Sequence, residues 1–149
     1  MRIHALGLAA LLALSAGPSP RVKSLSVRRY CARGHLSVET EWREDSLVFV
    51  GTVRSARRVA SPDGEFWDRT VYRVRVDEAF RGHPAAEATL YAENDSGRFP
   101  MLTGRPYVLF ASEWDGHLRV DNCGNSGPLP AAAPVLARVR ALRREAGHH

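Results

Sequence analysis

The stretch Leu-Val-Phe-Val-Gly-Thr-Val at residues 47–53 decides the fold. Its density of β-branched and aromatic residues predicts a strand. Side chains alternate between the two faces of a strand, and both faces of this one begin with apolar residues. We therefore expect a central strand that is buried on both sides, with a bulge or sharp bend at Gly51.

Four further strand patterns lie on the C-terminal side of this run. The clearest is Thr70–Phe80, where apolar residues from Tyr72 to Phe80 alternate with charged ones, which predicts one buried face and one wet face. The other three are the apolar segments 88–92, 107–111 and 118–120. Turn signals separate the strands, including Pro62-Asp63-Gly64 and the Asp115-Gly116 pair of a tight hairpin.

Five strands with short connections fit a closed barrel better than an open sheet, which would leave unpaired edges. A five-stranded Greek-key barrel is the OB architecture. Near the C-terminus, Val135–Glu145 has the period of an amphipathic helix with Val139 on its inner face. Before the first strand, the spacing of Val38 and Trp42 predicts a short helical segment over 38–45. The predicted fold class is mainly β, a five-stranded OB-like Greek-key barrel with a C-terminal helix.

Residues 1–17 have the pattern of a secretory signal peptide. A positive charge is followed by an apolar core from Ala5 to Leu14, and small residues come next. A cut after Ser15 would satisfy the small-x-small rule, and an uncleaved N-terminal anchor is the alternative. In this interpretation residues 18–30 form a flexible, basic leader, and the globular domain covers 31–149.

Export would bring the chain into an oxidising compartment, which gives its two cysteines a role. Cys31 and Cys123 are the only pair in the sequence, so we expect one disulfide; two free thiols are the alternative. The formal net charge is +5, and Lys23 is the only lysine, so arginine carries the excess. A basic balance favours anionic partners. The expected location is secreted or periplasmic.

Two groups of residues are candidates for contact with a partner. Phe66 and Trp67 follow the predicted turn, and aromatic side chains at a hairpin tip are typical of binding hot spots. The alternative is that they fold back over the barrel as a lid. Arg73 and Arg75 lie on the wet face of their strand and join a predicted basic patch. The other members of that patch are Arg54, Arg57, Arg58 and Arg69.

The sequence carries no sign of catalysis or of a metal site. It has no Gly-x-Ser-x-Gly motif, and cysteines in a disulfide offer no thiolate. The six histidines are scattered without the spacing of metal ligands. We therefore expect no enzymatic activity, no cofactor, no metal ion and no small-molecule substrate.

Several segments of the chain, in their order and spacing, resemble the netrin-like domains, and within them the bacterial proteins similar to tissue inhibitors of metalloproteinases. The segments are Cys31 followed by Ser46–Val53, Tyr72–Val76 with Ala79–Gly82, Phe99 and Gly104 with Tyr107–Ala111, and Leu118–Cys123. The resemblance spans about residues 31 to 130 and implies an OB-like barrel with flanking helices.

The resemblance also implies a mechanism, from which this sequence departs. In the metalloproteinase inhibitors the mature chain begins at a cysteine, whose free amine and carbonyl chelate the zinc ion of the protease. Here about fifteen residues separate the expected cleavage site from Cys31. Ala32-Arg33 stands in place of the rest of the usual Cys-x-Cys pair, and Ser96-Gly97 stands where a further cysteine is often found. Zinc chelation would therefore require a second cleavage that exposes Cys31.

Together these features predict a monomeric, netrin-like OB-fold domain that binds a protein partner, with metalloproteases as the class that the resemblance implies. In the related inhibitors, the loop that corresponds to 62–67 reaches toward the partner. We therefore expect partner contact from Phe66, Trp67, Arg73 and Arg75. The alternative is a basic module that binds an anionic glycan, a lipid surface or nucleic acid.

Overall fold

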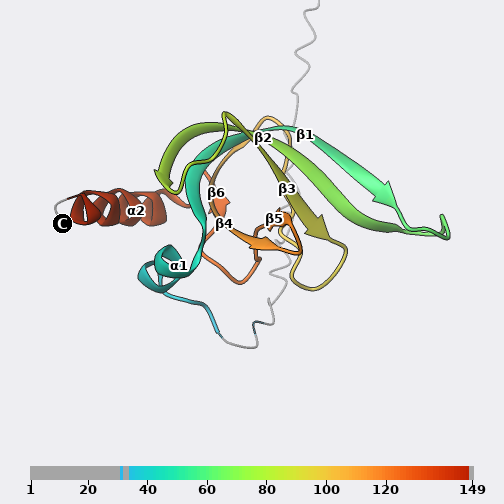
Figure 1. Cartoon of the computed structure of the whole chain (residues 1–149), viewed down its shortest axis with the longest axis horizontal. Helices are drawn as coiled ribbons and strands as arrows, with labels where there is room; N and C mark the ends of the chain where they lie inside the picture. Colours follow the sequence, from blue (N-terminus) through green and yellow to red (C-terminus); the bar gives the residue numbers. More distant parts are fainter. Residues whose placement is uncertain (1–30, 32–33, 148–149) are drawn as a thin grey trace, which may run out of the picture.

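The computed structural model describes Cys31 and residues 34–147. The predicted signal peptide and leader lie outside the described residues. The described elements are α1 (Val38–Glu44), β1 (Leu47–Ala60), β2 (Trp67–Arg81), β3 (Glu87–Glu93), β4 (Pro106–Trp114), β5 (His117–Arg119), β6 (Gly127–Pro128) and α2 (Ala133–Ala146). Figure 1 shows the strands curled into a barrel, with α2 extending from one end.

Five strands close a ring in the order β1-β2-β3-β5-β4, and β4 pairs again with β1. Neighbours in the ring are antiparallel except β3 and β5, which run parallel at Leu90 and Tyr91. The two-residue β6 pairs with Tyr107 and Val108 of β4, and its Gly-Pro sequence carries no strand signal. The predicted OB-like barrel of five strands with a C-terminal helix is confirmed.

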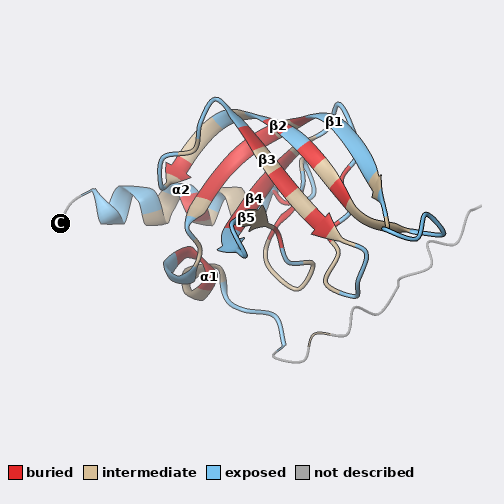
Figure 2. Ribbon diagram, turned by 45° about the vertical axis from the view of Figure 1, so that its right-hand side comes forward, coloured by how far each residue is buried: buried red, intermediate tan, exposed pale blue. Residues whose placement is uncertain are grey.

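Strand β1 is apolar on both faces because it separates two hydrophobic clusters. Phe49 and Val53, both fully buried, belong to the cluster inside the barrel. Val48 and Val50 belong to an outer cluster, between the barrel wall and the two helices. Figure 2 shows the buried stretches of β2 and β3 crossing the barrel. The prediction of a central strand buried on both sides is confirmed.

Irregular pairing bends β1 and β2 around the barrel. One register shift lies at Gly51, where the sequence predicts a bulge. A Cβ atom on Gly51 would lie 2.5 Å from Val74 Cγ1, so this close approach requires glycine. A second shift leaves Phe80 without a partner in β1, and Phe80 packs in the outer cluster. The prediction that Phe80 shares the interior face of Tyr72 is therefore wrong, because the two shifts break the simple alternation.

The predicted helices are both confirmed, with ends within two residues of the expectation. Ser37 caps α1, since its side chain accepts a hydrogen bond from the Thr40 amide at 3.1 Å. Trp42 of α1 and Val139 of α2 are buried in the outer cluster. Pro134 is tolerated in the first turn of α2, where its missing N–H has no helical partner.

A disulfide joins Cys31 to Cys123, with 5.6 Å between their Cα atoms, which confirms the predicted pairing. It ties the segment before α1 to the loop after β5. Disulfides persist in oxidising compartments such as the periplasm or the extracellular space, so the bond indicates such a compartment. Among the described residues, no helix has the length and apolar character needed to cross a membrane.

Candidate functional site

The first hairpin extends well beyond the barrel. β1 pairs with β4 over Leu47–Thr52, and from Arg54 onward the ladder continues with β2. The side chains from Arg54 to Arg58 are exposed. We call residues 54–68 the arm; it comprises the exposed outer part of β1, the turn and the first two residues of β2, and Figure 1 shows the β1–β2 hairpin projecting to one side of the barrel. The predicted strand ended at Val53 because no apolar alternation follows it; backbone pairing with β2 extends it to Ala60.

Hydrogen bonds fix the tip of the arm. The Ser61 amide donates to the Phe66 carbonyl oxygen at 2.9 Å, and the Phe66 amide donates to Ser61 Oγ at 3.2 Å. The Ser61 hydroxyl also donates to the Asp63 carboxylate, which accepts from the Glu65 amide at 3.1 Å. These two bonds lower the pKa of Asp63. The predicted turn is confirmed, with Gly64 at a φ of 75°.

The two aromatic residues of the arm have different surroundings. Phe66 lies at the tip and is 71% exposed. Trp67 is half-buried, and the guanidinium carbons of Arg58 and Arg98 lie 5.1 and 5.0 Å from the centre of its ring. The structure therefore separates a pair that the sequence treats together: one ring faces water and the other packs against arginine side chains.

Arg73 and Arg75 lie on the wet face of β2, as predicted, and both are paired with carboxylates. Arg73 contacts Glu87 of β3 at 2.6 Å, and Arg75 contacts Asp77 at 2.7 Å. Partial burial opposes ionisation of Asp77, but hydrogen bonds from Thr52 and Arg75 outweigh it and lower its pKa. This part of the wet face therefore carries alternating charges.

The other arginines of the predicted patch are divided between two faces. Arg57 pairs with Val71 and Arg58 with Thr70, so strand alternation turns these adjacent side chains in opposite directions. Among the described side chains, neither forms an ion pair with a carboxylate. Arg69 lies 3.9 Å from Glu93. By this register Arg57 and Arg69 share the face of Arg73 and Arg75, whereas Arg58 lies on the other face, so the structure removes Arg58 from the predicted patch.

A cluster of carboxylates surrounds a cavity of about 450 Å³ beside the disulfide. Its members are Glu41, Glu44, Asp45 and Asp121. Glu41 is buried and accepts hydrogen bonds from the backbone and side-chain amides of Asn125, both at 2.6 Å. Burial nevertheless raises the pKa of Glu41.

Asp45 has the largest shift in this carboxylate cluster. Burial is the main cause, and the negative charges of Glu41, Glu44 and Asp121 add to it. Arg81 acts in the opposite direction, and the net effect raises the pKa of Asp45 to about 7. Sequence reasoning missed this cluster because Asp121 joins it from the loop after β5; the run Glu44-Asp45 close to Glu41 was the available signal.

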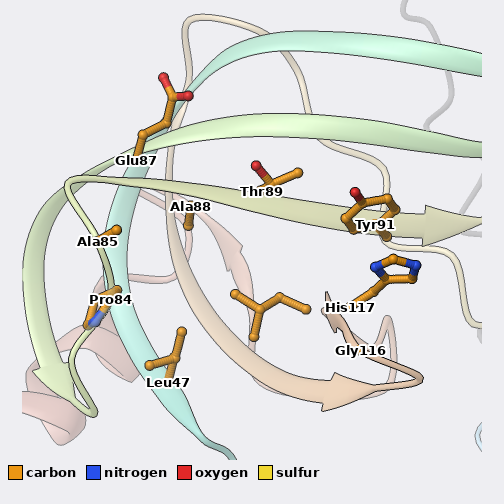
Figure 3. Close-up of a pocket in the computed structure, with 10 residues that line it drawn as sticks. Leu47, Pro84, Ala85, Glu87, Ala88, Thr89, Tyr91, Gly116 and His117 are labelled. Atoms are coloured by element: carbon orange, nitrogen blue, oxygen red, sulfur yellow. The ribbon is translucent and has the colours of Figure 1, made fainter.

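An opening in the barrel wall forms a second cavity. β5 has three residues and pairs with β3 at Leu90 and Tyr91, so a cavity of about 340 Å³ remains beside the start of β3. Figure 3 shows Tyr91 next to His117, and their rings stack with centres 4.2 Å apart. Glu87 is the one carboxylate among the residues that line this cavity, and none of the lining residues is an arginine. We call it the seam cavity.

Over residues 34–147 and Cys31, no group of three or more His, Cys, Asp or Glu side chains is placed to hold a metal ion. Both cysteines are in the disulfide, so neither offers a thiolate there. Three features of the described surface could contact a ligand or partner. They are the exposed aromatic tip, the arginines around Trp67 and the carboxylate cluster. No protein-family model matches this chain, and a search of curated proteins found no match.

Proposed function

We propose that this chain is an exported binding module of netrin-like type that recognises a protein partner through its arm and catalyses no reaction. The observation that carries the proposal is Phe66, which is 71% exposed at the tip of a projecting hairpin. Removing an aromatic ring from water is favourable, and aromatic side chains are frequent hot spots of protein interfaces. We therefore assign Phe66 as the anchor of the contact.

The arm holds Phe66 in a defined position. Hydrogen bonds between Ser61 and Phe66 close the turn at the tip. Directly after this turn, Asn94 Nδ2 donates to the Trp67 carbonyl oxygen at 3.0 Å and connects the arm to the loop after β3. A segment that is ordered before binding loses less conformational entropy on association. This preorganisation supports recognition by the arm.

Export is part of the proposal. The predicted signal peptide would direct the chain out of the cytoplasm, and the Cys31–Cys123 disulfide agrees with an oxidising compartment. We place the protein in the periplasm or outside the cell, as a monomer whose partner shares that compartment.

A metalloprotease is the partner class to test first, because the sequence resembles bacterial proteins similar to tissue inhibitors of metalloproteinases. Cys31 is joined to Cys123, and the neighbouring Asn122 donates to the carbonyl oxygens of Ser96 and Gly97 at 2.6 and 3.2 Å. The positions that the resemblance singles out around Cys31, Ser96-Gly97 and Cys123 therefore lie close together. Inhibition by zinc chelation requires Cys31 to be the first residue of the mature protein, which N-terminal sequencing decides.

The alternative is a module that binds an anionic glycan, a lipid surface or nucleic acid. Arg54 and Arg57 favour it, because both are exposed and neither pairs with a described carboxylate. Arg73 and Arg75 weigh against it, because Glu87 and Asp77 neutralise them. A steep loss of binding with rising salt would identify this alternative.

The experiment compares the wild-type chain with Phe66→Ala and Leu102→Ala. Leu102 is the matched control, since it is a large apolar side chain that is 60% exposed outside the arm. Affinity capture from the native extracellular fraction, followed by mass spectrometry, identifies the partner, whose Kd is then measured at low and high salt. Any captured metalloprotease is assayed for inhibition.

We expect Phe66→Ala to weaken binding by about tenfold or more and Leu102→Ala to leave it unchanged. Equal affinities of wild type and Phe66→Ala would contradict the role of the arm. Turnover of a small substrate by the purified chain would contradict a purely binding function.

A further inference from the structure

A cavity of about 300 Å³ lies on the inner face of the arm, and two arginines reach it. The arm and β2 contribute Arg58, Trp67, Thr70 and Tyr72, and the loop between β3 and β4 contributes Arg98 and Met101. We call it the arm cavity. Its lining contains no carboxylate.

The strand register explains how Arg58 and Trp67 come together. Arg58 lies opposite Thr70 in the ladder, and Trp67 lies opposite Ala60 on the same face of the arm. The guanidinium carbons of Arg58 and Arg98 are 5.1 and 5.0 Å from the centre of the Trp67 ring. The two guanidinium carbons therefore lie no more than about 10 Å apart, and the Trp67 ring attracts both positive groups.

Neither of these two charges is compensated by an ion pair among the described residues. Arg73, Arg75 and Arg140 each donate to a carboxylate at 2.6 or 2.7 Å. Arg98 donates instead to the uncharged Asn94 Oδ1 at 3.3 Å, and Arg58 has no ion pair among the described residues. Two like charges at one half-buried ring attract an anion to this place.

We propose that the arm cavity binds a compact oxyanion, a carboxylate, sulfate or phosphate group, between the guanidinium groups of Arg58 and Arg98. Guanidinium groups donate two parallel hydrogen bonds to such groups, which gives both strength and orientation. The ring of Trp67 supplies a flat apolar wall for the carbon atoms that carry the anion. The seam cavity offers no such site, because no arginine lines it.

On a protein partner the bound group is an acidic side chain or a chain terminus. The inference rests on the proposed function only where it says that a protein partner supplies the anionic group. A small anion can occupy the cavity without any partner. The arm then makes contact in two places, through Phe66 at its tip and through the oxyanion site on its inner face beside Trp67.

The experiment is isothermal titration calorimetry of the full mature chain with glutarate, sulfate and phosphate, at an ionic strength held constant with sodium chloride. We expect saturable binding of at least one of the three, and their order of affinity identifies the group that fits best. Arg58→Gln and Arg98→Gln should each weaken that binding by about tenfold or more. Both replacements keep a polar side chain of the same carbon stem and remove the charged guanidinium group.

Arg57→Gln is the matched control, because it removes the same charge from the opposite face of the same strand. We expect it to leave anion binding unchanged, and thermal denaturation checks that every variant is folded. Heats that do not saturate with any of the three anions would overturn the proposal. Equal weakening by Arg57→Gln and Arg58→Gln would overturn it too, because it would mean general charge attraction.

The two proposals fail separately. Phe66→Ala should retain small-anion binding, since Phe66 is not part of the arm cavity. Heats that do not saturate with any anion, together with weakened partner binding in Phe66→Ala, would overturn the oxyanion site and leave the proposed function standing. Loss of anion binding in Arg58→Gln with full partner binding would show that the partner does not occupy the site.

Discussion

At the scale of single residues, the carboxylate cluster shows how burial and charge act together on one side chain. Asp45 caps the C-terminal end of α1 and is close to the charges of Glu41, Glu44 and Asp121, which Arg81 opposes. Its pKa of about 7 in the folded chain compares with 3.8 for an unperturbed aspartate. Between these two values the folded state holds a proton that the unfolded state releases.

This difference makes the free energy of unfolding depend on pH. Most acids in folded proteins have a lowered pKa and stabilise the fold as pH rises, and Asp45 acts in the opposite direction. The unfolded state binds fewer protons between pH 4 and 7, so the free energy of unfolding falls as pH rises through about that range. Glu41 contributes in the same direction, because its pKa is also raised. The charged cluster is therefore most costly at and above neutral pH.

We expect Asp45→Asn to raise the free energy of unfolding at about pH 8 and to flatten its fall between about pH 5 and pH 8. The asparagine keeps the shape and removes the charge, so repulsion by Glu41, Glu44 and Asp121 disappears. Urea denaturation across that pH range measures the effect. Asp115→Asn, in the exposed turn between β4 and β5, is the control and should keep the wild-type slope. An unchanged slope in Asp45→Asn would contradict the assignment.

At the scale of elements, the arm combines a supporting residue with an exposed one. Trp67 contacts Arg58 and Arg98 on the inner face of the arm, whereas its neighbour Phe66 projects from the tip. A half-buried ring that packs against neighbouring side chains stabilises the folded state through lost contacts with water and through cation–π attraction. An exposed ring at a tip contributes little to stability.

We therefore expect Trp67→Ala to lower the free energy of unfolding by about 1–2 kcal/mol and Phe66→Ala to change it by less than about 0.5 kcal/mol. Thermal or urea denaturation of the two variants, side by side with wild type, measures the difference. A loss of stability in Phe66→Ala equal to that of Trp67→Ala would mean that Phe66 packs on the barrel, and it would remove the basis for an exposed binding tip.

The end of β1 is an element boundary that the local side-chain pattern does not predict. Alternating apolar residues predict β1 up to Val53, because there each side chain faces one of two cores. Beyond that point the strand contains exposed arginine, serine and alanine, and its ladder with β2 depends on backbone hydrogen bonds. The side-chain pattern gives no sign of these backbone hydrogen bonds. The sequence therefore predicted the turn of the arm and not its strands.

At the scale of the whole molecule, one covalent link holds the N-terminal segment to the late part of the domain. Cys31 and Cys123 are 92 residues apart in sequence, and the intervening chain contains α1 and the five strands of the ring. A cross-link that closes so long a loop restricts the unfolded chain strongly. The same link borders the carboxylate cluster, so it also holds that site together.

We expect the double replacement Cys31→Ser with Cys123→Ser to lower the free energy of unfolding by about 4 kcal/mol. Chemical denaturation of the oxidised wild type and of the double variant measures this loss. Reductant should destabilise the wild type and leave the double variant unchanged, which is the control. A double variant as stable as the oxidised wild type would show that the link contributes nothing to the fold.

The sequence by itself determined what depends on neighbours along the chain. Periodicity assigned Phe49 and Val48 to opposite faces, turn residues placed the arm tip, and the amphipathic pattern of α2 put Val139 in the core. Burial of apolar side chains follows local alternation, so these features can be read from short windows. Pairing of the two cysteines followed from their number and the expected export.

Only the tertiary structure decided what depends on residues far apart in sequence. It closed the ring through the parallel β3–β5 pair, turned Phe80 to the outer cluster and split Arg57 from Arg58. It also brought Arg98 to Trp67 and Asp121 to Asp45. Such contacts depend on strand register and loop paths, which no local pattern of side chains encodes. The physical reason is that the polarity of each side chain determines whether it is buried, whereas the distance between two charged side chains depends on the path of the whole chain.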